Sequence, residues 1–162
     1  MSTVEELESE DNITEAEAVS TEQYLTFIME EEEYGVDILA VQEIRGWESA
    51  TPVPNSPDYI KGVINLRGTI VPIMDLRGRF ELTKPEYGPE TVVIVLKIEF
   101  EKGSRIMGII VDAISDVYDV PIDDIKRTGF GDNQNARFIK GLVTVNKHMV
   151  ILLKLEQFLT FD

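Results

Sequence analysis

The chain has 162 residues with 43% hydrophobic content, which fits one ordinary domain or two very small ones that share a core. A formal charge of −15 repels phosphate backbones and argues against nucleic acid as a partner, and the absence of cysteine excludes disulfides and thiol chemistry. The longest apolar runs are strand-sized, far below the roughly 20 residues of a membrane span, and no secretory signal is visible, so we expect a cytoplasmic protein without direct membrane insertion.

The first 22 residues form an acidic segment, which we expect to be a disordered tail. They contain eight acidic residues, no lysine or arginine, and few apolar side chains. Such a segment cannot bury enough apolar surface to offset the entropy of ordering. Solubility is the default role of an acidic tail, and docking or regulation is the alternative. The remaining 140 residues carry a charge of only −7.

Short β-type runs broken by turn residues follow the tail. Residues 24–29 and 34–38 read as strands, with the acidic run 30–33 as the solvated turn between them. Residues 39–44 mix strand and helical spacing and suit an irregular turn. Residues 45–53 read as a further strand, which ends at two prolines because proline cannot donate to a ladder.

Residues 60–77 predict a β-hairpin. Two runs rich in β-branched residues flank the polar tip Asn65-Leu66-Arg67-Gly68, and Gly68 can adopt the positive φ that a tight reversal needs. The arginine at the tip could serve recognition or could simply be solvated, and the hairpin alone does not decide between the two.

An internal repeat relates the two halves of the chain. The segment Ile60-Lys61-Gly62 recurs 79 positions later at residues 139–141, and the segment that begins at Gly35 recurs 73 positions later at Gly108. We therefore expect two copies of one all-β unit, at about residues 23–84 and 90–162. Each copy supplies about five short strands, which predicts two small barrels packed on one another.

No catalytic, cofactor or metal constellation is evident. His148 is the sole histidine and falls at the second hairpin's tip, where a solvated turn residue is favoured over a general base. The glycines of residues 129–133 lack a nucleotide fingerprint. Trp47 suits an interface anchor or the core. Val41 and Ile114 are equivalent in the two copies and could line a seam between the barrels, either as core or as a groove.

These residues carry a family signature. Residues 33–46, Glu-Tyr-Gly-Val-Asp-Ile-Leu-Ala-Val-Gln-Glu-Ile-Arg-Gly, and the hairpin 59–77 closely resemble the bacterial chemotaxis adaptor family CheW, with similarity over roughly residues 22–162. The resemblance implies two intertwined five-stranded SH3-like β-barrels around a shared hydrophobic core.

The resemblance also implies a non-enzymatic adaptor that tethers the histidine kinase CheA, through its regulatory domain, to the cytoplasmic tips of methyl-accepting chemoreceptors. We expect a monomer when the protein is free, recruited to membrane-associated receptor arrays when it is bound. For receptor docking, the resemblance implies an apolar groove formed by Leu25, Ile38, Val41, Ile44 and Ile114. For complex assembly it implies Glu43, Asn65 and Arg67, without saying which partner each contacts.

Two alternatives compete with this interpretation. A CheV-like coupling protein would need a receiver domain, and a piece of the kinase would need an ATP-binding domain, but 140 residues of paired barrel leave no room for either. An enzyme or a small-ligand barrel would need a site that the residue inventory does not supply.

Overall fold

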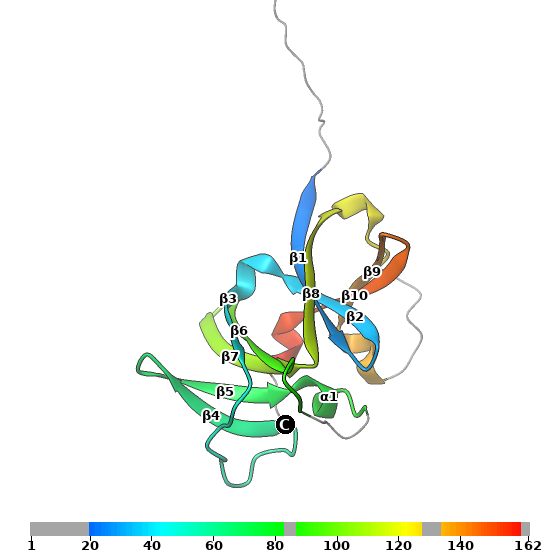
Figure 1. Cartoon of the computed structure of the whole chain (residues 1–162). Helices are drawn as coiled ribbons and strands as arrows, with labels where there is room; N and C mark the ends of the chain where they lie inside the picture. The colour runs from blue at the N-terminus through cyan, green and yellow to red at the C-terminus, as the bar shows by residue number, and fades with distance from the viewer. Residues whose placement is uncertain (1–19, 83–86, 128–133, 160–162) are drawn as a thin grey trace, which may run out of the picture.

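The computed structural model describes residues 20–82, 87–127 and 134–159, and the described chain is dominated by β-strands arranged in two five-stranded sheets (Figure 1). The residues predicted as a disordered tail lie outside this description up to position 19. Strand β1 begins at Thr21, so Thr21 and Glu22, the last two residues of the predicted tail, lie in a strand.

Sheet 1 has the strand order β8-β1-β2-β10-β9. Its strands β1 and β2 bury side chains on both faces, since Tyr24 and its neighbour Leu25 belong to two different apolar clusters. The bounds of the strands are Thr21–Met29 for β1, Glu32–Asp37 for β2, Ala113–Pro121 for β8, Ile139–Val145 for β9 and His148–Leu153 for β10.

Sheet 2 repeats this arrangement with the order β3-β6-β7-β5-β4. Its central strands β6 and β7 are rich in valine and isoleucine, which favours strands that are buried over most of their length. The bounds are Val41–Gly46 for β3, Ile60–Leu66 for β4, Thr69–Asp75 for β5, Val92–Phe100 for β6 and Gly103–Val111 for β7.

Short helical turns connect the strands. They are η1 (Ile38–Ala40), α1 (Leu76–Arg79), η2 (Ile122–Asp124), η3 (Gln134–Phe138) and η4 (Leu155–Leu159). The buried carboxylate of Asp75 begins α1, because its Oδ1 accepts hydrogen bonds from the backbone N–H groups of Arg77 and Gly78. Its other oxygen accepts the hydroxyl of Tyr87, 2.5 Å away, which ties the segment after residue 86 to α1.

The two sheets exchange strands between the sequence repeats. Sheet 1 joins β1 and β2 of the first repeat to β8, β9 and β10 of the second. Sheet 2 joins β3, β4 and β5 of the first repeat to β6 and β7 of the second. In each sheet one parallel pair joins the two repeats: β10 pairs with β2, where Leu152 lies opposite Gly35, and β5 pairs with β7, where Ile73 lies opposite Gly108. The repeat is therefore real, but the prediction that each repeat forms one barrel is wrong, and the intertwined arrangement implied by the family resemblance is confirmed.

A glycine in each repeat allows a loop to approach a hairpin closely. A Cβ on Gly62 would lie 2.1 Å from the Thr51 carbonyl oxygen, and one on Gly141 would lie 2.4 Å from the Ile125 side chain. The approach forms the isolated bridges between Thr51 and Val63 and between Lys126 and Leu142. The glycine of the repeated Ile-Lys-Gly segment is thus required by packing.

Three apolar clusters hold the domain together. One lies inside each sheet's curve, and the third and largest, which we call the central core, lies between the sheets. The central core takes Phe27 from sheet 1, Ile94 from sheet 2, and Phe138 and Phe158 from the connecting turns, all of them 1% exposed or less. Burial of each such side chain contributes about 1.5–3 kcal/mol, so the central core binds the two sheets into one unit.

Two other local predictions differ from the structure. The segment 39–44 is irregular only as far as Ala40, after which β3 runs to Gly46 beside β6. The strand predicted over residues 45–53 is present only at its first two residues, because β3 ends at Gly46, and Trp47 then packs on the cluster inside sheet 2 and against Tyr87. Trp47 is half-buried and belongs to this packing.

Candidate protein-docking site

Two edge strands flank the central core, and each carries one of the two equivalent seam residues. Val41 begins β3 and lies opposite Leu96, whereas Ile114 lies near the start of β8 opposite Phe27. Leu96 and Phe27 are fully buried in the central core, and Val41 and Ile114 pack against it with part of their surface exposed. The two residues that are equivalent in the sequence repeat therefore both lie at the rim of the central core.

Ile44 and Val117 extend this rim into solvent. Ile44 on β3 is 43% exposed, and Val117 on β8 is 45% exposed. They lie 73 positions apart, the same separation as Val41 and Ile114, so they occupy matched positions in the two repeats. Sequence reasoning missed Val117, although applying the repeat offset to Ile44 would have found it.

The remaining two groove candidates differ in accessibility. Ile38 belongs to η1 and packs, half-buried, against the central core. Leu25 lies inside that core with only 3% of its surface exposed, because its side chain packs between the two sheets. We therefore exclude Leu25 from the accessible surface and define the rim surface as Ile38, Val41, Ile44, Ile114 and Val117.

The assembly candidates Glu43 and Arg67 form an ion pair. Arg67 Nη2 at the hairpin tip lies 2.7 Å from Glu43 Oε1 on β3, and Arg45 Nη1 lies 3.8 Å from the other oxygen of the same carboxylate. Glu43 is a residue of the strand that also carries Val41 and Ile44. The charged pair and part of the rim surface thus meet on one edge strand, β3.

The hairpin tip is held by its own turn chemistry. Both central residues have positive φ, 51° at Arg67 and 90° at Gly68, as in the type I′ turn that suits the twist of a two-residue hairpin loop. Asn65 Oδ1 accepts a hydrogen bond of 2.8 Å from the Gly68 N–H and closes the turn. Asn65 therefore positions the tip, and Arg67 projects from it with 76% of its side chain exposed.

The second hairpin ends differently. Its turn residues Asn146 and Lys147 also have positive φ, but no arginine stands there. His148 was predicted as a plain solvated residue, whereas its Nε2 lies 2.6 Å from Glu33 Oε1. Glu32 and Glu33 both lie in β2, and Glu33 is 8% exposed, so the prediction that residues 30–33 are a solvated turn is wrong at its last two positions.

Residues suited to metal binding or membrane crossing do not gather in the described part of the chain. No three acidic or histidine side chains of residues 20–82, 87–127 and 134–159 are placed to hold a metal ion. Within the same ranges, no helix is long and apolar enough to cross a bilayer.

Comparison with known proteins relates this chain to one protein family. A CheW-like domain model matches residues 23–161. The chemotaxis protein CheW of Klebsiella aerogenes is 43% identical over 142 residues, which cover 87% of this chain and 83% of that protein. The chemotaxis protein CheW of Rhizobium meliloti is 37% identical and covers 82% of this chain and 83% of its own length.

A solved structure agrees with these sequence relatives. The crystal structure of the scaffolding protein TtCheW from Thermoanaerobacter tengcongensis superposes with a TM-score of 0.75 at 30% identity, over 83% of this chain and 90% of that one. The match of domain, sequence and fold over most of the chain shows that this protein belongs to the CheW family of non-enzymatic chemotaxis scaffolding proteins.

Proposed function

We propose that this scaffold couples the histidine kinase CheA, through the kinase's regulatory domain, to the cytoplasmic tips of methyl-accepting chemoreceptors. In this proposal the protein is cytoplasmic, monomeric when free, and recruited to receptor arrays at the membrane. The observation that carries the proposal is the rim surface, in which matched apolar side chains of two edge strands border one core.

A receptor tip is a suitable occupant of the rim surface. An amphipathic helix buries an apolar face against a groove through residues three or four positions apart. Ile44 on β3 and Val117 on β8, at 43% and 45% exposure, supply exposed apolar side chains, and the partly exposed Val41 and Ile114 of the same two strands pack against the core. Burial of this apolar area would drive docking, with Glu43 and Arg67 at the margin to set orientation.

The test is a titration of the full, isotopically labelled chain with a receptor-tip helical hairpin and, separately, with the kinase regulatory domain. We expect the receptor fragment to shift amide signals at Val41, Ile44, Ile114 and Val117. We expect the kinase fragment to bind as well and to shift a different set. Binding to only one of the two fragments would contradict a coupling role, and sedimentation of the free chain as a dimer would contradict the monomer.

A further inference from the structure

Strand β3 contains one extra residue between its two rim residues. Val41 lies opposite Leu96 and Glu43 lies opposite the next residue of β6, Val95, so Gln42 has no counterpart of its own. An extra residue on one strand of an antiparallel pair is a β-bulge, which bends the strand and re-aims the side chains that follow it. We call this irregularity the β3 bulge.

Strand β8 has the same irregularity. Leu25 lies opposite Val117 and Phe27 lies opposite Ile114, so a step of two residues on β1 matches a step of three residues on β8. The extra residue falls within Ser115–Asp116, and Ser115 lies 73 positions after Gln42. This β8 bulge is therefore the counterpart of the β3 bulge in the other copy of the repeat.

The two bulges decide which side chains reach the rim surface. In a regular strand, residues three positions apart point to opposite faces. Val41 and Ile44 are three positions apart, and so are Ile114 and Val117. The residues that lie opposite these four all belong to the central core: Leu96, Ile94, Phe27 and Leu25. Since directly opposite residues of an antiparallel pair share a face, each bulge brings both rim residues of its strand to the face of the central core.

The β8 bulge is held by the side chain of one buried residue, Thr26 of β1. Thr26 is 0% exposed and lies opposite the bulge, between Leu25 and Phe27. Its Oγ1 accepts a hydrogen bond of 3.1 Å from the Asp116 N–H and donates one of 3.1 Å to the Asp116 carbonyl. Because a bulge disrupts the backbone ladder, the hydroxyl supplies both partners that the backbone of Asp116 needs.

Asp116 in turn holds the rim residue Val117. The Asp116 Oδ1 atom accepts a hydrogen bond of 2.8 Å from the Val117 N–H. The Val117 side chain is 45% exposed, so packing alone does not fix its direction. A chain of hydrogen bonds therefore leads from the buried Thr26 hydroxyl to an exposed residue of the rim surface.

The matching position in the other copy has no hydroxyl. Gly35 lies opposite Thr26, and its equivalent Gly108 lies opposite Val95, so Thr26 corresponds to Val95. Val95 lies opposite the β3 bulge, just as Thr26 lies opposite the β8 bulge. The chain itself thus shows that a valine fits opposite such a bulge.

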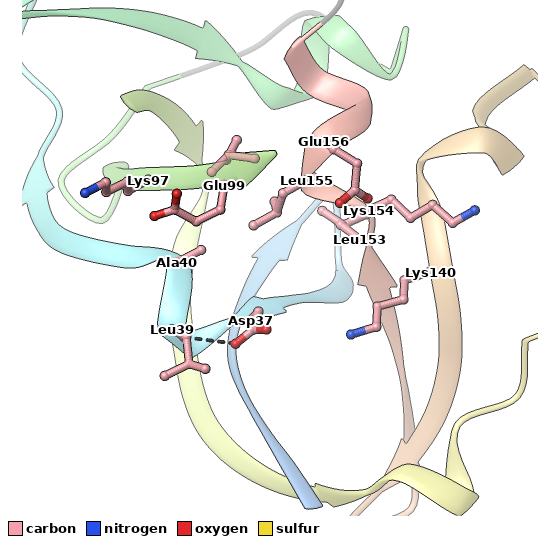
Figure 2. Close-up of a pocket in the computed structure, with 11 residues that line it drawn as sticks. Asp37, Leu39, Ala40, Lys97, Glu99, Lys140, Leu153, Lys154, Leu155 and Glu156 are labelled. Atoms are coloured by element: carbon pink, nitrogen blue, oxygen red, sulfur yellow. Dashed lines mark hydrogen bonds between the residues drawn. The ribbon is translucent and has the colours of Figure 1, made fainter. Parts of the chain in front are cut away.

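The β3 bulge has a different support, in the chain that precedes it. Strand β3 begins at Val41, directly after η1. The Leu39 N–H of η1 donates a hydrogen bond of 2.9 Å to Asp37 Oδ1, and Ala40 leads from this turn into β3 (Figure 2). A side-chain hydroxyl opposite the bulge is therefore a feature of the β8 side of the rim surface.

We propose that Thr26 is a positioning residue for protein docking: its buried hydroxyl fixes the β8 bulge, which presents Ile114 and Val117 together to the partner. This inference rests on the proposed function, because it takes the rim surface as the receptor-docking surface. Without the hydroxyl, the backbone of Asp116 loses its two partners and the bulge can move along β8. A shift of one residue turns Val117 to the opposite face.

The test compares three variants of the full, isotopically labelled chain. Thr26→Val keeps the shape of the side chain and removes the hydroxyl, whereas Thr26→Ser keeps the hydroxyl. Thr91→Val is the matched control, because Thr91 is 5% exposed and its Oγ1 accepts a hydrogen bond of 2.8 Å from the Gly88 N–H, outside the rim surface. Denaturant unfolding measures the stability of each variant.

The probe is the receptor-tip helical hairpin, titrated under conditions in which each variant is folded. We expect Thr26→Val to bind it about fivefold more weakly, the change that the loss of one hydrogen-bonding group gives. Thr26→Ser should recover most of the affinity, and Thr91→Val should lose stability but bind normally. In the free Thr26→Val chain, the amide signals of Asp116 and Val117 should shift, and the Asp116 N–H should exchange faster with solvent.

Two results would overturn the proposal. They are unchanged receptor affinity in folded Thr26→Val, and equal losses of affinity in Thr26→Val and Thr91→Val. If Thr26→Val does not fold, Asp116→Ala tests the same chain of hydrogen bonds with an exposed residue, and unchanged receptor affinity in that variant would also overturn the proposal.

The same experiment separates this inference from the proposed function. Failure of the unaltered chain to bind the receptor fragment would contradict the proposed function. The amide shifts and the exchange rate of the free Thr26→Val chain would still show whether Thr26 holds the β8 bulge. Normal binding by the unaltered chain and by Thr26→Val would remove only the role of Thr26.

Discussion

Arg67 at the tip of the β4–β5 hairpin reaches Glu43 on edge strand β3, with 2.7 Å between Nη2 and Oε1. Arg67 lies in the turn between β4 and β5, whereas Glu43 lies in β3, and β4 and β3 occupy opposite edges of sheet 2. The contact therefore spans the sheet's curve and fixes the hairpin tip relative to the rim surface. A partner that contacts either residue would encounter both.

Replacement of Arg67 by alanine should leave the fold intact. The side chain is 76% exposed, and exposed changes usually alter the free energy of unfolding by about 0.5 kcal/mol or less. Assembly of the ternary complex with kinase and receptor fragments should nevertheless weaken, which sedimentation of the complex would measure. A variant with unchanged assembly, or an unfolded one, would contradict this role.

A double-mutant cycle between Arg67→Ala and Glu43→Ala separates pairing from independent contacts. If the two residues act as one unit, the double variant should lose little more assembly than either single variant. In the free chain we expect a coupling of about 0.2–1 kcal/mol, typical of exposed ion pairs. Fully additive losses in assembly would show that each residue has its own partner contact.

Ile44→Asp and Val117→Asp should each impair receptor binding without unfolding the chain. Both side chains are more than two-fifths exposed, so the new carboxylate remains solvated in the free protein but would be buried against a docked helix. Titration of each variant with the receptor-tip hairpin would measure the loss. Phe100→Asp, at a similarly exposed position on the far end of β6, is the matched control and should bind normally.

Leu25→Ala should act on stability and not on a contact surface. Its side chain is 3% exposed in the central core, where removal of a leucine costs about 2–5 kcal/mol through lost burial and the cavity left behind. Denaturant unfolding followed by circular dichroism would measure this cost. A variant of normal stability that fails to bind receptor would instead return Leu25 to the accessible groove.

Glu22 should make stability depend on acid pH. The hydrogen bond from Tyr24, followed by the nearby Lys140, lowers the pKa of Glu22 below its ordinary value of 4.5. A carboxylate with a lowered pKa stabilises the fold above its unfolded pKa, and this stabilisation is lost as pH falls through the folded value. Glu22→Gln should therefore be less stable than the unaltered chain at pH 6, and the difference should shrink below pH 4.5 in acid unfolding curves.

Much of the fold and part of the site follow from local patterns. The Asn65–Gly68 tip identifies the hairpin because turn chemistry is local, and the repeat places Val41 and Ile114 at equivalent positions that the structure brings to one core. Strand exchange could not be predicted from the repeat. Similar sequences in the two copies would allow β2 to pair with the last hairpin of either copy, and a local pattern does not select between them.

The sequence pattern also could not predict which of these side chains are buried. Leu25 and Ile44 are both apolar residues within predicted strands or turns, yet one is covered by neighbours on both sides and the other stands on an edge. Glu33 likewise looked like its acidic neighbours, yet it lies in β2 between β1 and β10, with His148 of β10 beside its carboxylate. These distinctions depend on contacts between segments that lie far apart in the chain.

The pairing of β2 with β10 has a consequence for how the protein forms in the cell. Sheet 1 cannot be completed until the last strands have left the ribosome. Until then, the edge of β2 that pairs with β10 has no hydrogen-bonding partner strand. Such late, long-range pairing slows folding and leaves emerging chains open to wrong partners. A nascent chain of this scaffold would therefore be a natural client for chaperones until its final hairpin arrives.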